Sequence, residues 1–515
     1  MFNSREIKRG NASGLFFLNS VIRGKNIFQN SSAFHRLGAV IFTAILLIGA
    51  TVRIYGAWQL RHNLNSDSGV VALMAKHMAE GKDFPVFYYG QAYMGSLEPM
   101  ISAIFCALFG TSGFMVTLGT AFVGWLVLLA VFVWARDAHS SAAGLAAMAW
   151  CMIGPSGFVH YQVLPRGGYT VTILLSALIL WLSSRLIIKE SNKCHSDPPT
   201  GGEESLPKLS VWRRSFVPAY RKNGTQDDRV CGIYDVLHNY GRWFLLGIIA
   251  GLGWWSNQLI ISAIFTAALM TLVFLRGKII SFNTLSAAVG FFIGSLPFWR
   301  WNALHGWQTF EFAGSLGRTP FTRGLKIFFW ERLPNLLDLN HGIILWRIVG
   351  AAVYLGAAIF FIAFLWKILK NHAFGHANGL ASRQGKKGIY LFTAFVFILI
   401  SALIFSTSHF AMMNTSLYLL PLIPVIAVIF GVMTAELAKR KTFFLGIIPL
   451  AVVIANQAAN LSFLPERGAG EEKYQRQIEE CGRFLKSQGI LACYTPYGKH
   501  GWNFALREEI CFCDL

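Results

Sequence analysis

Residues 38–58 read GAVIFTAILLIGATVRIYGAW, and residues 65–81, a few positions later, read NSDSGVVALMAKHMAEG. The first stretch has about 20 mostly apolar residues, which as a helix rising 1.5 Å per residue crosses the roughly 30 Å hydrocarbon layer of a membrane. The second stretch starts with polar residues and continues with apolar residues at helical spacing. We therefore predict a membrane-spanning helix that leads directly into a structured loop outside the bilayer.

The composition of the whole chain agrees with a membrane protein. Of the 515 residues, 54% are hydrophobic and 14% are charged, whereas soluble domains carry about 25% charged residues. This excludes an ordinary soluble enzyme and predicts an all-α polytopic membrane protein. Apolar blocks recur along the chain, and we predict eleven spans, at residues 38–58, 114–135, 141–156, 169–188, 243–257, 258–275, 281–301, 343–366, 389–408, 417–437 and 443–463.

The distribution of charge predicts how the chain is oriented. Met100–Gly110 is apolar but too short to cross a bilayer, so we expect an interfacial helix at the outer surface. With a cytoplasmic N-terminus, the cytoplasmic pieces hold 27 Lys and Arg against 10 Asp and Glu, and the outer pieces hold 18 against 15. Because basic residues concentrate in cytoplasmic loops, the net charge of +20 indicates topology and not a nucleic acid partner. We predict a multi-pass protein of the cell inner membrane with an extracytoplasmic C-terminus.

Three parts follow from this topology. They are a basic cytoplasmic N-terminus (residues 1–37), a transmembrane domain (38–464) and an outer appendage (465–515). Residues 1–36 contain no signal-peptide core, so the first span is expected to stay as an anchor. Within the transmembrane domain, residues 189–242 predict a flexible cytoplasmic loop and residues 302–341 an outer loop.

The outer appendage has signals of both helix and strand. A helix is predicted at Glu471–Gln488, ending at Gly489, with short strands at Ile490–Tyr494 and Ile510–Phe512. A small α/β unit is therefore expected. The sequence leaves open whether one or two disulfides form among Cys481, Cys493, Cys511 and Cys513.

Residues 59–113 form a loop far longer than ordinary connections, and loops of this length usually carry function. Ser66 is suited to cap a helix, which places Asp67 in the first turn, although an Asp there often only favours the helix dipole. Aromatic and polar side chains follow. Aromatic residues alone are typical of a membrane interface, but Gln91 and Glu98 indicate a further role.

The order of Asp67, a helix, Gly81, the segment YYGQAYMGSLE (88–98) and a short apolar helix ending in Phe109-Gly110 resembles membrane glycosyltransferases of the GT-C superfold. Within that superfold it resembles the family 39-like branch, which is related to protein O-mannosyltransferases and lipid A aminoarabinose transferases. Two weaker matches lie later in the chain. They are Gly294-Ser295-Leu296-Pro297 with Trp301-Asn302, and Tyr418-Leu419-Leu420-Pro421-Leu422.

The resemblance implies transfer of a sugar from a polyprenyl-phosphate carrier to a glycan, lipid or protein acceptor outside the cytoplasm. It maps the family's acid in the first outer loop onto Asp67. The chain departs from the family at three points: Ser68 follows Asp67 in place of a second acid, Leu97-Glu98-Pro99-Met100 replaces a Lys-Pro-Pro element, and Leu417 replaces an Arg. The donor-phosphate ligands and the sugar type therefore stay open.

Such a transfer needs few catalytic residues. An acceptor hydroxyl that attacks the anomeric carbon needs a base, but no strong acid, because phosphate leaves as a stabilised anion. The two-carboxylate rule of glycosidases therefore need not apply. We predict Asp67 as the general base of an inverting transfer. Glu98 is either a second carboxylate that orients the acceptor or a metal ion, or a structural residue.

Cations are scarce on the predicted outer side. Arg166, in a glycine-rich turn, is the first candidate to bind phosphate, because arginine contacts phosphate with two nitrogens; snorkelling towards membrane lipids is the alternative. Tyr88, Tyr89, Tyr93 and Trp502 are expected to stack on sugars, and lipid-facing grooves to hold the prenyl chain. The other predicted substrate-binding residues are Gln91, His160, Tyr169, Arg318, Arg323 and His409, with Tyr161 beside His160.

The remaining signals are negative or open. No Cys and His spacing is typical of zinc and no nucleotide-phosphate loop occurs, so no cofactor is predicted, and a divalent metal stays open. A flippase or exporter of lipid-linked sugars is one alternative function. It predicts ionisable residues in mid-span, and the sequence shows few. A non-catalytic partner in envelope polysaccharide synthesis is the other, which the missing second acid permits.

Overall fold

A computed structural model describes residues 32–62, 66–193, 226–275, 281–315, 317–340, 344–371, 383–439, 443–490, 492–495 and 511–514. Most of the N-terminal part, the centre of the 189–242 insert and Trp502 therefore lie outside the described residues.

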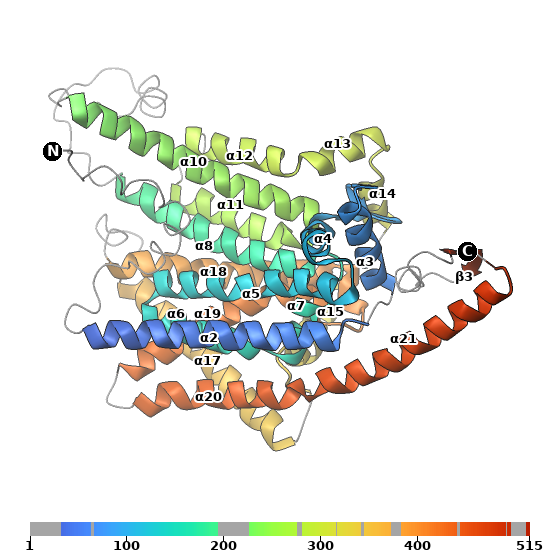
Figure 1. The fold of residues 1–515 in the computed structure, drawn as a ribbon. Coiled ribbons are helices and arrows are strands. Elements are labelled where there is room, and N and C mark those ends of the chain that lie inside the picture. Colours follow the sequence, from blue (N-terminus) through green and yellow to red (C-terminus); the bar gives the residue numbers. More distant parts are fainter. Residues whose placement is uncertain are drawn as a thin grey trace, which may run out of the picture.

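Long helices that run side by side make up most of the structure (Figure 1). Among the described residues, eight helices are long and apolar enough to cross a membrane, or ten if each of two bent pairs is one span. These contain ten of the eleven predicted spans. The eleventh, residues 243–257, lies in α10, which runs along α12 (Figure 1). The long helices are α2 (Ser32–Gln59), α5 (Gly113–Ala138), α6 (Ser141–Ile153), α8 (Tyr169–Lys193), α10 (Gln226–Ser256), α11 (Ile261–Leu275), α12 (Phe282–Gly294), α17 (Ile344–Asn371), α18 (Arg383–Thr407), α19 (Ile423–Ala438) and α20 (Phe443–Ala459).

Short elements gather at one end of this bundle. They include α4, which is apolar but only 13 residues long, as predicted for a helix that does not span. Figure 1 shows α3 and α4 at the same end as α21 and the C-terminal strands, as the predicted topology requires. The short elements are α3 (Ser66–Ala79), β1 (Phe87–Tyr88), β2 (Gln91–Gly95), α4 (Leu97–Phe109), α7 (Ser156–Val163), α13 (Leu296–Leu304), α14 (Gln308–Ser315), α15 (Phe321–Ile327), α16 (Leu333–Leu336), η5 (Leu417–Leu422) and η6 (Asn460–Ser462), with β1 and β2 antiparallel.

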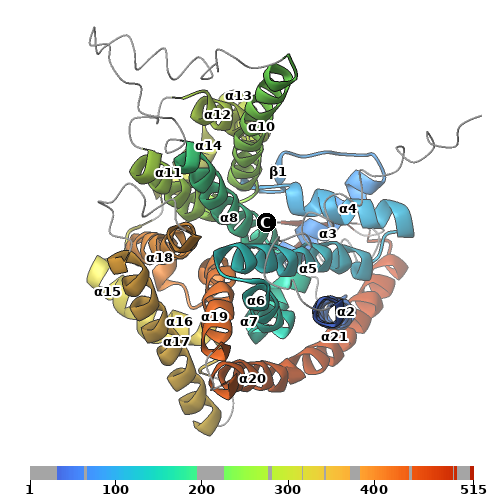
Figure 2. The same ribbon diagram turned by 90° about the vertical axis from the view of Figure 1, so that its left-hand side faces the viewer.

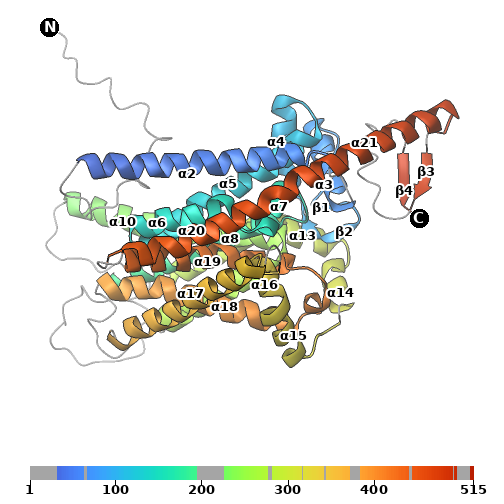
Figure 3. The same cartoon turned by 90° about the horizontal axis from the view of Figure 1, so that it is seen from below.

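The C-terminal appendage is built on α21 (Phe463–Ser487), which leaves the bundle and leads to two strands (Figure 3). The strands β3 (Ala492–Thr495) and β4 (Cys511–Asp514) are parallel. Helix and strands lie close to the predicted positions, but α21 starts earlier than predicted because it continues from α20 through η6. Cys481 is a free thiol, and the side chains of the other three tail cysteines are outside the described part.

The 189–242 insert is helical at both ends. Helix α8 continues to Lys193 and α10 begins at Gln226, so the predicted flexible loop is wrong for these flanks. The charged residues that made this stretch look like a loop are compatible with a helix whose end projects from the bundle.

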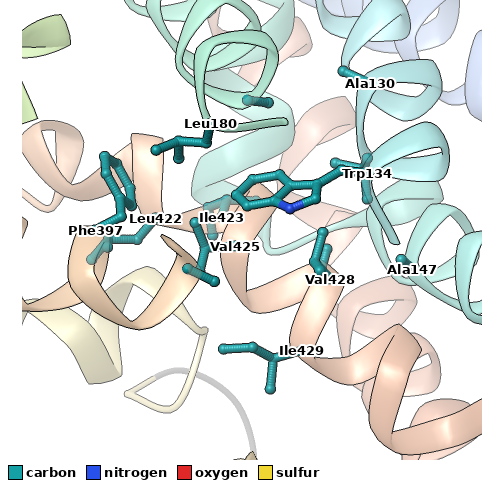
Figure 4. Close-up of a cluster of buried hydrophobic side chains, with 14 of the residues drawn as sticks. Ala130, Trp134, Ala147, Leu180, Phe397, Leu422, Ile423, Val425, Val428 and Ile429 are labelled. Atoms are coloured by element: carbon teal, nitrogen blue, oxygen red, sulfur yellow. The ribbon is translucent and has the colours of Figure 1, made fainter. Parts of the chain in front are cut away.

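The core lies where α5, α8 and α19 meet, surrounded by other helices in the end-on view (Figure 2). Helix α19 is buried almost entirely, whereas α2 and α17 expose most of their apolar surface, as expected of helices that face lipid. Trp134 of α5 is fully buried and packs among Leu180, Phe397 and Val428 (Figure 4). One apolar core therefore joins helices that are distant in sequence.

Two predicted spans are sharply bent. Helices α6 and α7 meet at 76°, across Gly154, which has a φ of 73°, and Pro155. Helices α12 and α13 meet at 57°, with Pro297 in the first turn of α13. Proline lacks the N–H that would continue the helix, so each bend lies where the sequence ends the helical hydrogen bonding. The bends in the spans predicted at 141–156 and 281–301 were not predicted.

The α6–α7 bend is held by a buried arginine. Helix α2 faces outward along most of its length, yet Arg53 is 1% exposed. Its guanidinium donates to the carbonyls of Met152 (3.0 Å) and Cys151 (3.2 Å) at the end of α6, and to Oε1 of Gln162 in α7 (2.5 Å). A cation is favourable at a helix C-terminus, where carbonyls lack partners. The sequence analysis overlooked Arg53.

We expect Arg53→Met to destabilise the protein by about 1–3 kcal/mol, because two buried carbonyls lose their donors. Thermal unfolding of the detergent-purified protein measures this. Arg36→Met is the matched control, since Arg36 lies on the same helix and is exposed. Equal effects of the two substitutions would contradict the assigned role of Arg53.

Candidate active site

Asp67 and Arg166 form an ion pair at the end of the bundle that holds the short elements. Asp67 is in the first turn of α3, and Arg166 lies in the turn between α7 and α8. Arg166 Nε donates to Asp67 Oδ2 at 2.9 Å, and the side chains of Arg166 and Asp67 are 35% and 22% exposed. The two residues that the sequence analysis ranked first as base and as phosphate ligand are thus in direct contact and open to solvent.

Each member of the pair keeps further hydrogen-bonding capacity. Within the described residues, the two terminal nitrogens of Arg166 and the second carboxylate oxygen of Asp67 make no hydrogen bond. A guanidinium can therefore bind a phosphate through its terminal nitrogens while its Nε stays on Asp67.

Glu98 holds the turn that carries Arg166. Its side chain is 1% exposed, and its Oε2 accepts the N–H of Gly168 (2.8 Å), the N–H of Arg166 (3.1 Å) and the hydroxyl of Tyr88 (3.0 Å). Thr120 of α5 donates to Oε1 at 3.5 Å. Of the two roles left open for Glu98, this geometry favours the structural one.

The turn after Pro165 depends on its two glycines. Gly167 and Gly168 have backbone φ angles of 65° and 70°, which residues other than glycine rarely adopt. A Cβ on Gly168 would lie 2.8 Å from Oγ of Ser256, at the end of α10. Asn257 donates to the carbonyl of Gly167 at 2.7 Å. The end of α10 therefore closes the turn from the side opposite to Glu98.

Tyrosines surround the ion pair. Tyr169 is buried and meets the ring of Tyr418 edge to face, with 6.2 Å between centroids. Tyr418 also stacks on Phe410 at 4.3 Å. Both tyrosines lie within electrostatic range of Asp67 and Arg166. The predicted residue Tyr169 therefore belongs to the site. Tyr418 belongs there too, and the sequence analysis had noted it only as part of a weak motif.

The aromatic segment after α3 builds the loop more than it lines the site. Tyr88 is 3% exposed and donates to Glu98, so its ring presents almost no surface on which a sugar could stack. The Tyr89 hydroxyl donates to Asp83 at 3.0 Å and contacts His77 Nδ1 at 2.8 Å. Gln91 and Tyr93 lie in β2 and are partly exposed, with Tyr93 in electrostatic range of Tyr169.

A cavity of about 460 Å³ is lined in part by α7, the helix that precedes the Arg166 turn. His160 and Tyr161 contribute to its wall, with their rings edge to face at 5.0 Å. Tyr161 is also within electrostatic range of Arg166. The predicted pair His160 and Tyr161 therefore connects the cavity with Arg166. The lining residues are Ser156, Gly157, His160, Tyr161, Asn335, Leu336, Asp338, Asn414, Thr415, Ser416, Leu417, Leu420 and Asn460.

The other predicted cations do not join Asp67. Arg318 and Arg323 are exposed, and in the described part of the chain neither side chain makes a hydrogen bond or an ion pair. The Arg318 backbone pairs with Ser408, next to His409. The buried arginine of this loop is Arg332, which donates to Asn414 Oδ1 at 2.8 Å. Arg332 was not predicted, because the sequence does not show which arginine of the 302–341 loop is buried.

A metal site is not apparent in the part of the chain that the structure covers. No three His, Cys, Asp or Glu side chains of the described residues lie close enough together to hold a metal ion.

Comparisons with known proteins settle the fold. No family model matches the sequence, and no curated protein matches it. ArnT from Cupriavidus metallidurans in the apo state, a lipid A aminoarabinose transferase, matches with a TM-score of 0.55 at 12% identity, over 94% of this chain and 86% of that chain. This protein has the GT-C fold. The predicted fold class and resemblance are confirmed at this level.

Two further solved structures belong to the same comparison. ArnT bound to undecaprenyl phosphate matches the GT-C fold of this chain with a TM-score of 0.51 at 12% identity, over 92% of this chain and 85% of that chain. The oligosaccharyltransferase of Archaeoglobus fulgidus in the apo form has a TM-score of 0.45 at 12% identity. The match covers 92% of this chain and 64% of that chain.

We expect Glu98→Gln to change how stability depends on pH. Burial raises the pKa of Glu98, and the hydrogen bonds from Gly168, Tyr88, Arg166 and Thr120 only partly offset it. The folded state then holds the Glu98 proton more tightly than the unfolded chain, so the contribution of Glu98 to stability is full below the unfolded pKa and is lost as the pH rises through the folded pKa.

Thermal unfolding of both proteins across acidic and neutral pH measures this. The difference in Tm, wild type minus Glu98→Gln, should fall as the pH rises. A difference that grows with pH would mean that the four donors outweigh burial and hold Glu98 ionised.

Proposed function

We propose that this protein is an integral-membrane glycosyltransferase that moves a sugar from a polyprenyl-phosphate carrier to an acceptor hydroxyl at the outer membrane face. The observation that carries the proposal is the Asp67–Arg166 pair, a carboxylate and a cation 2.9 Å apart and open to solvent. The GT-C fold, shared with an ArnT that has been crystallised with undecaprenyl phosphate, supports the choice of carrier.

The roles of the two residues follow from their free atoms. The terminal nitrogens of Arg166 bind oxygens of the carrier phosphate, and the second oxygen of Asp67 accepts the proton of the acceptor hydroxyl. The hydroxyl oxygen attacks the anomeric carbon from the face opposite the phosphate. The bond between that carbon and the phosphate oxygen breaks, its electron pair leaves with the phosphate, and the anomeric configuration inverts. Arg166 stabilises the charge that develops on the phosphate.

The surroundings of the pair suit a lipid-linked donor. Helix α4 packs against α3, which carries Asp67, and exposes the apolar side chains of Ile104, Leu108 and Phe109. A prenyl chain in the bilayer can lie along such a surface while its phosphate reaches the interface. Glu98 acts indirectly, as a positioning residue that fixes the backbone of Arg166.

The two alternative functions fit the structure less well. A flippase needs ionisable groups along a path through the bilayer. Arg53, which lies inside the span of α2, is instead hydrogen-bonded to Gly49 of its own helix and to α6 and α7. A non-catalytic partner does not require a solvent-accessible base beside a cation.

We expect Asp67→Asn to lower sugar transfer by about 10²- to 10⁴-fold, because the amide cannot accept the hydroxyl proton. Release of labelled polyprenyl phosphate from polyprenyl-phosphate sugars by protein in lipid nanodiscs measures this. Asp83→Asn is the matched control, since Asp83 lies in the same loop and is exposed.

Two results would contradict this proposal. Normal transfer by a folded Asp67→Asn variant would remove Asp67 as the base. Reporter fusions that place residues 66–112 in the cytosol would remove the outer-face reaction.

A further inference from the structure

We propose that the cavity between α7, α16, η5 and η6 is a subsite for an uncharged, hydroxyl-rich sugar ring. This rests on the proposed function and names the chemistry of one substrate part. Its volume of about 460 Å³ lies within the range of about 300–1,000 Å³ that is typical of small-molecule pockets.

The wall of the cavity is polar and carries no lysine or arginine. Its polar side chains are mainly amides and hydroxyls. An amide offers both donors and acceptors, as a sugar hydroxyl does, so the two can satisfy each other. A phosphate group would need a cation, which this wall lacks. The amide and hydroxyl residues are Ser156, Asn335, Asn414, Thr415, Ser416 and Asn460.

The single carboxylate of the wall is already engaged. Asp338 is 2% exposed and accepts both the N–H and the hydroxyl of Ser156, each at 2.6 Å. It therefore caps α7 and does not present an open charge to an amino sugar. An uncharged sugar fits this wall better than a cationic one.

Two polar residues of the wall are held in place by hydrogen bonds to Arg332. Arg332 donates to Asn414 Oδ1 at 2.8 Å, and the hydroxyl of Ser416 donates to the carbonyl of Arg332 at 3.0 Å. A wall whose side chains are fixed before binding loses less entropy when a ligand arrives. Leu417, Leu420 and the ring of Tyr161 supply apolar surface for the C–H faces of a sugar.

The cavity is placed for the reaction at Asp67. Tyr161 belongs to its wall and lies within electrostatic range of Arg166, and Leu417 of the wall precedes Tyr418. A sugar in the cavity is therefore next to the phosphate and base positions. It is either the sugar of the donor or that of the acceptor.

Gly157→Leu tests the subsite because Gly157 belongs to the cavity wall and a larger side chain there takes up space in the cavity. A Cβ on Gly157 meets no heavy atom within 4 Å. Gly356→Leu in α17 is the matched control, since Gly356 is helical and exposed and its Cβ also meets nothing within 4 Å. Both substitutions replace a helical glycine by a good helix former, so both proteins should fold.

Saturation-transfer NMR on the protein in nanodiscs measures binding without turnover. The probes are methyl glycosides of glucose, mannose, galactose and N-acetylglucosamine, with methyl glucosaminide and inorganic phosphate for comparison. We expect the wild type and Gly356→Leu to bind at least one neutral glycoside, more tightly than methyl glucosaminide. Gly157→Leu should bind it about tenfold more weakly, which corresponds to about 1.4 kcal/mol.

The proposal is overturned if no neutral glycoside binds the wild type, or if Gly157→Leu binds as the wild type does. Preferred binding of methyl glucosaminide, or phosphate binding that Gly157→Leu abolishes, would overturn it as well. Since this assay needs no transfer, its failure is distinct from failure of the proposed function.

Transfer kinetics distinguish the two sources of the sugar. If the donor sugar occupies the cavity, Gly157→Leu raises the KM for the polyprenyl-phosphate sugar. If the acceptor sugar does, only the KM for the acceptor rises. Unchanged values of both KM and kcat would overturn the subsite.

Discussion

The carboxylate of Glu98 joins its own loop to a turn about 70 positions later in the sequence, and the geometry of the site depends on it. It lies on α4 and accepts hydrogen bonds from the hydroxyl of Tyr88 in β1 and from two backbone N–H groups of the turn before α8. Burying a carboxylate is costly unless it is hydrogen-bonded, so four donors converge on this one. Because the backbone of Arg166 is fixed in this way, its side chain reaches Asp67.

Arg53 follows the same physical rule inside the bundle. A guanidinium in an apolar region needs acceptors, and the bend between α6 and α7 supplies them as carbonyls at a helix end. The bend and the arginine thus stabilise each other. Helix α7, which leads into the Arg166 turn, is therefore anchored from α2, while Glu98 anchors the turn from α4.

The two anchors place a charged region and an uncharged region next to each other. Arg166 and Asp67 carry opposite charges, and the wall of the cavity offers mainly amides and hydroxyls. A lipid-linked sugar has the same division, with a charged phosphate beside a neutral ring. Tyr161 lies at the boundary between the two regions.

Local signals in the sequence were sufficient for the helices and for the first choice of residues. Apolar length predicted the spans, the shortness of Met100–Gly110 predicted α4, and residue type selected Asp67 and Arg166. The predicted helices are confirmed because hydropathy and helix starts depend on neighbours along the chain, whereas the roles of Asp67 and Arg166 stay predictions.

Packing alone decided which side chains are buried and what they touch. It brought Asp67 to Arg166 across 99 positions, turned Tyr88 inward to Glu98, and made Arg332 the buried arginine in place of Arg318. The acceptors of Arg53 in α6 and α7 lie 98 and 109 positions away in the sequence. Burial and hydrogen bonding join distant segments, and no pattern within one segment records them.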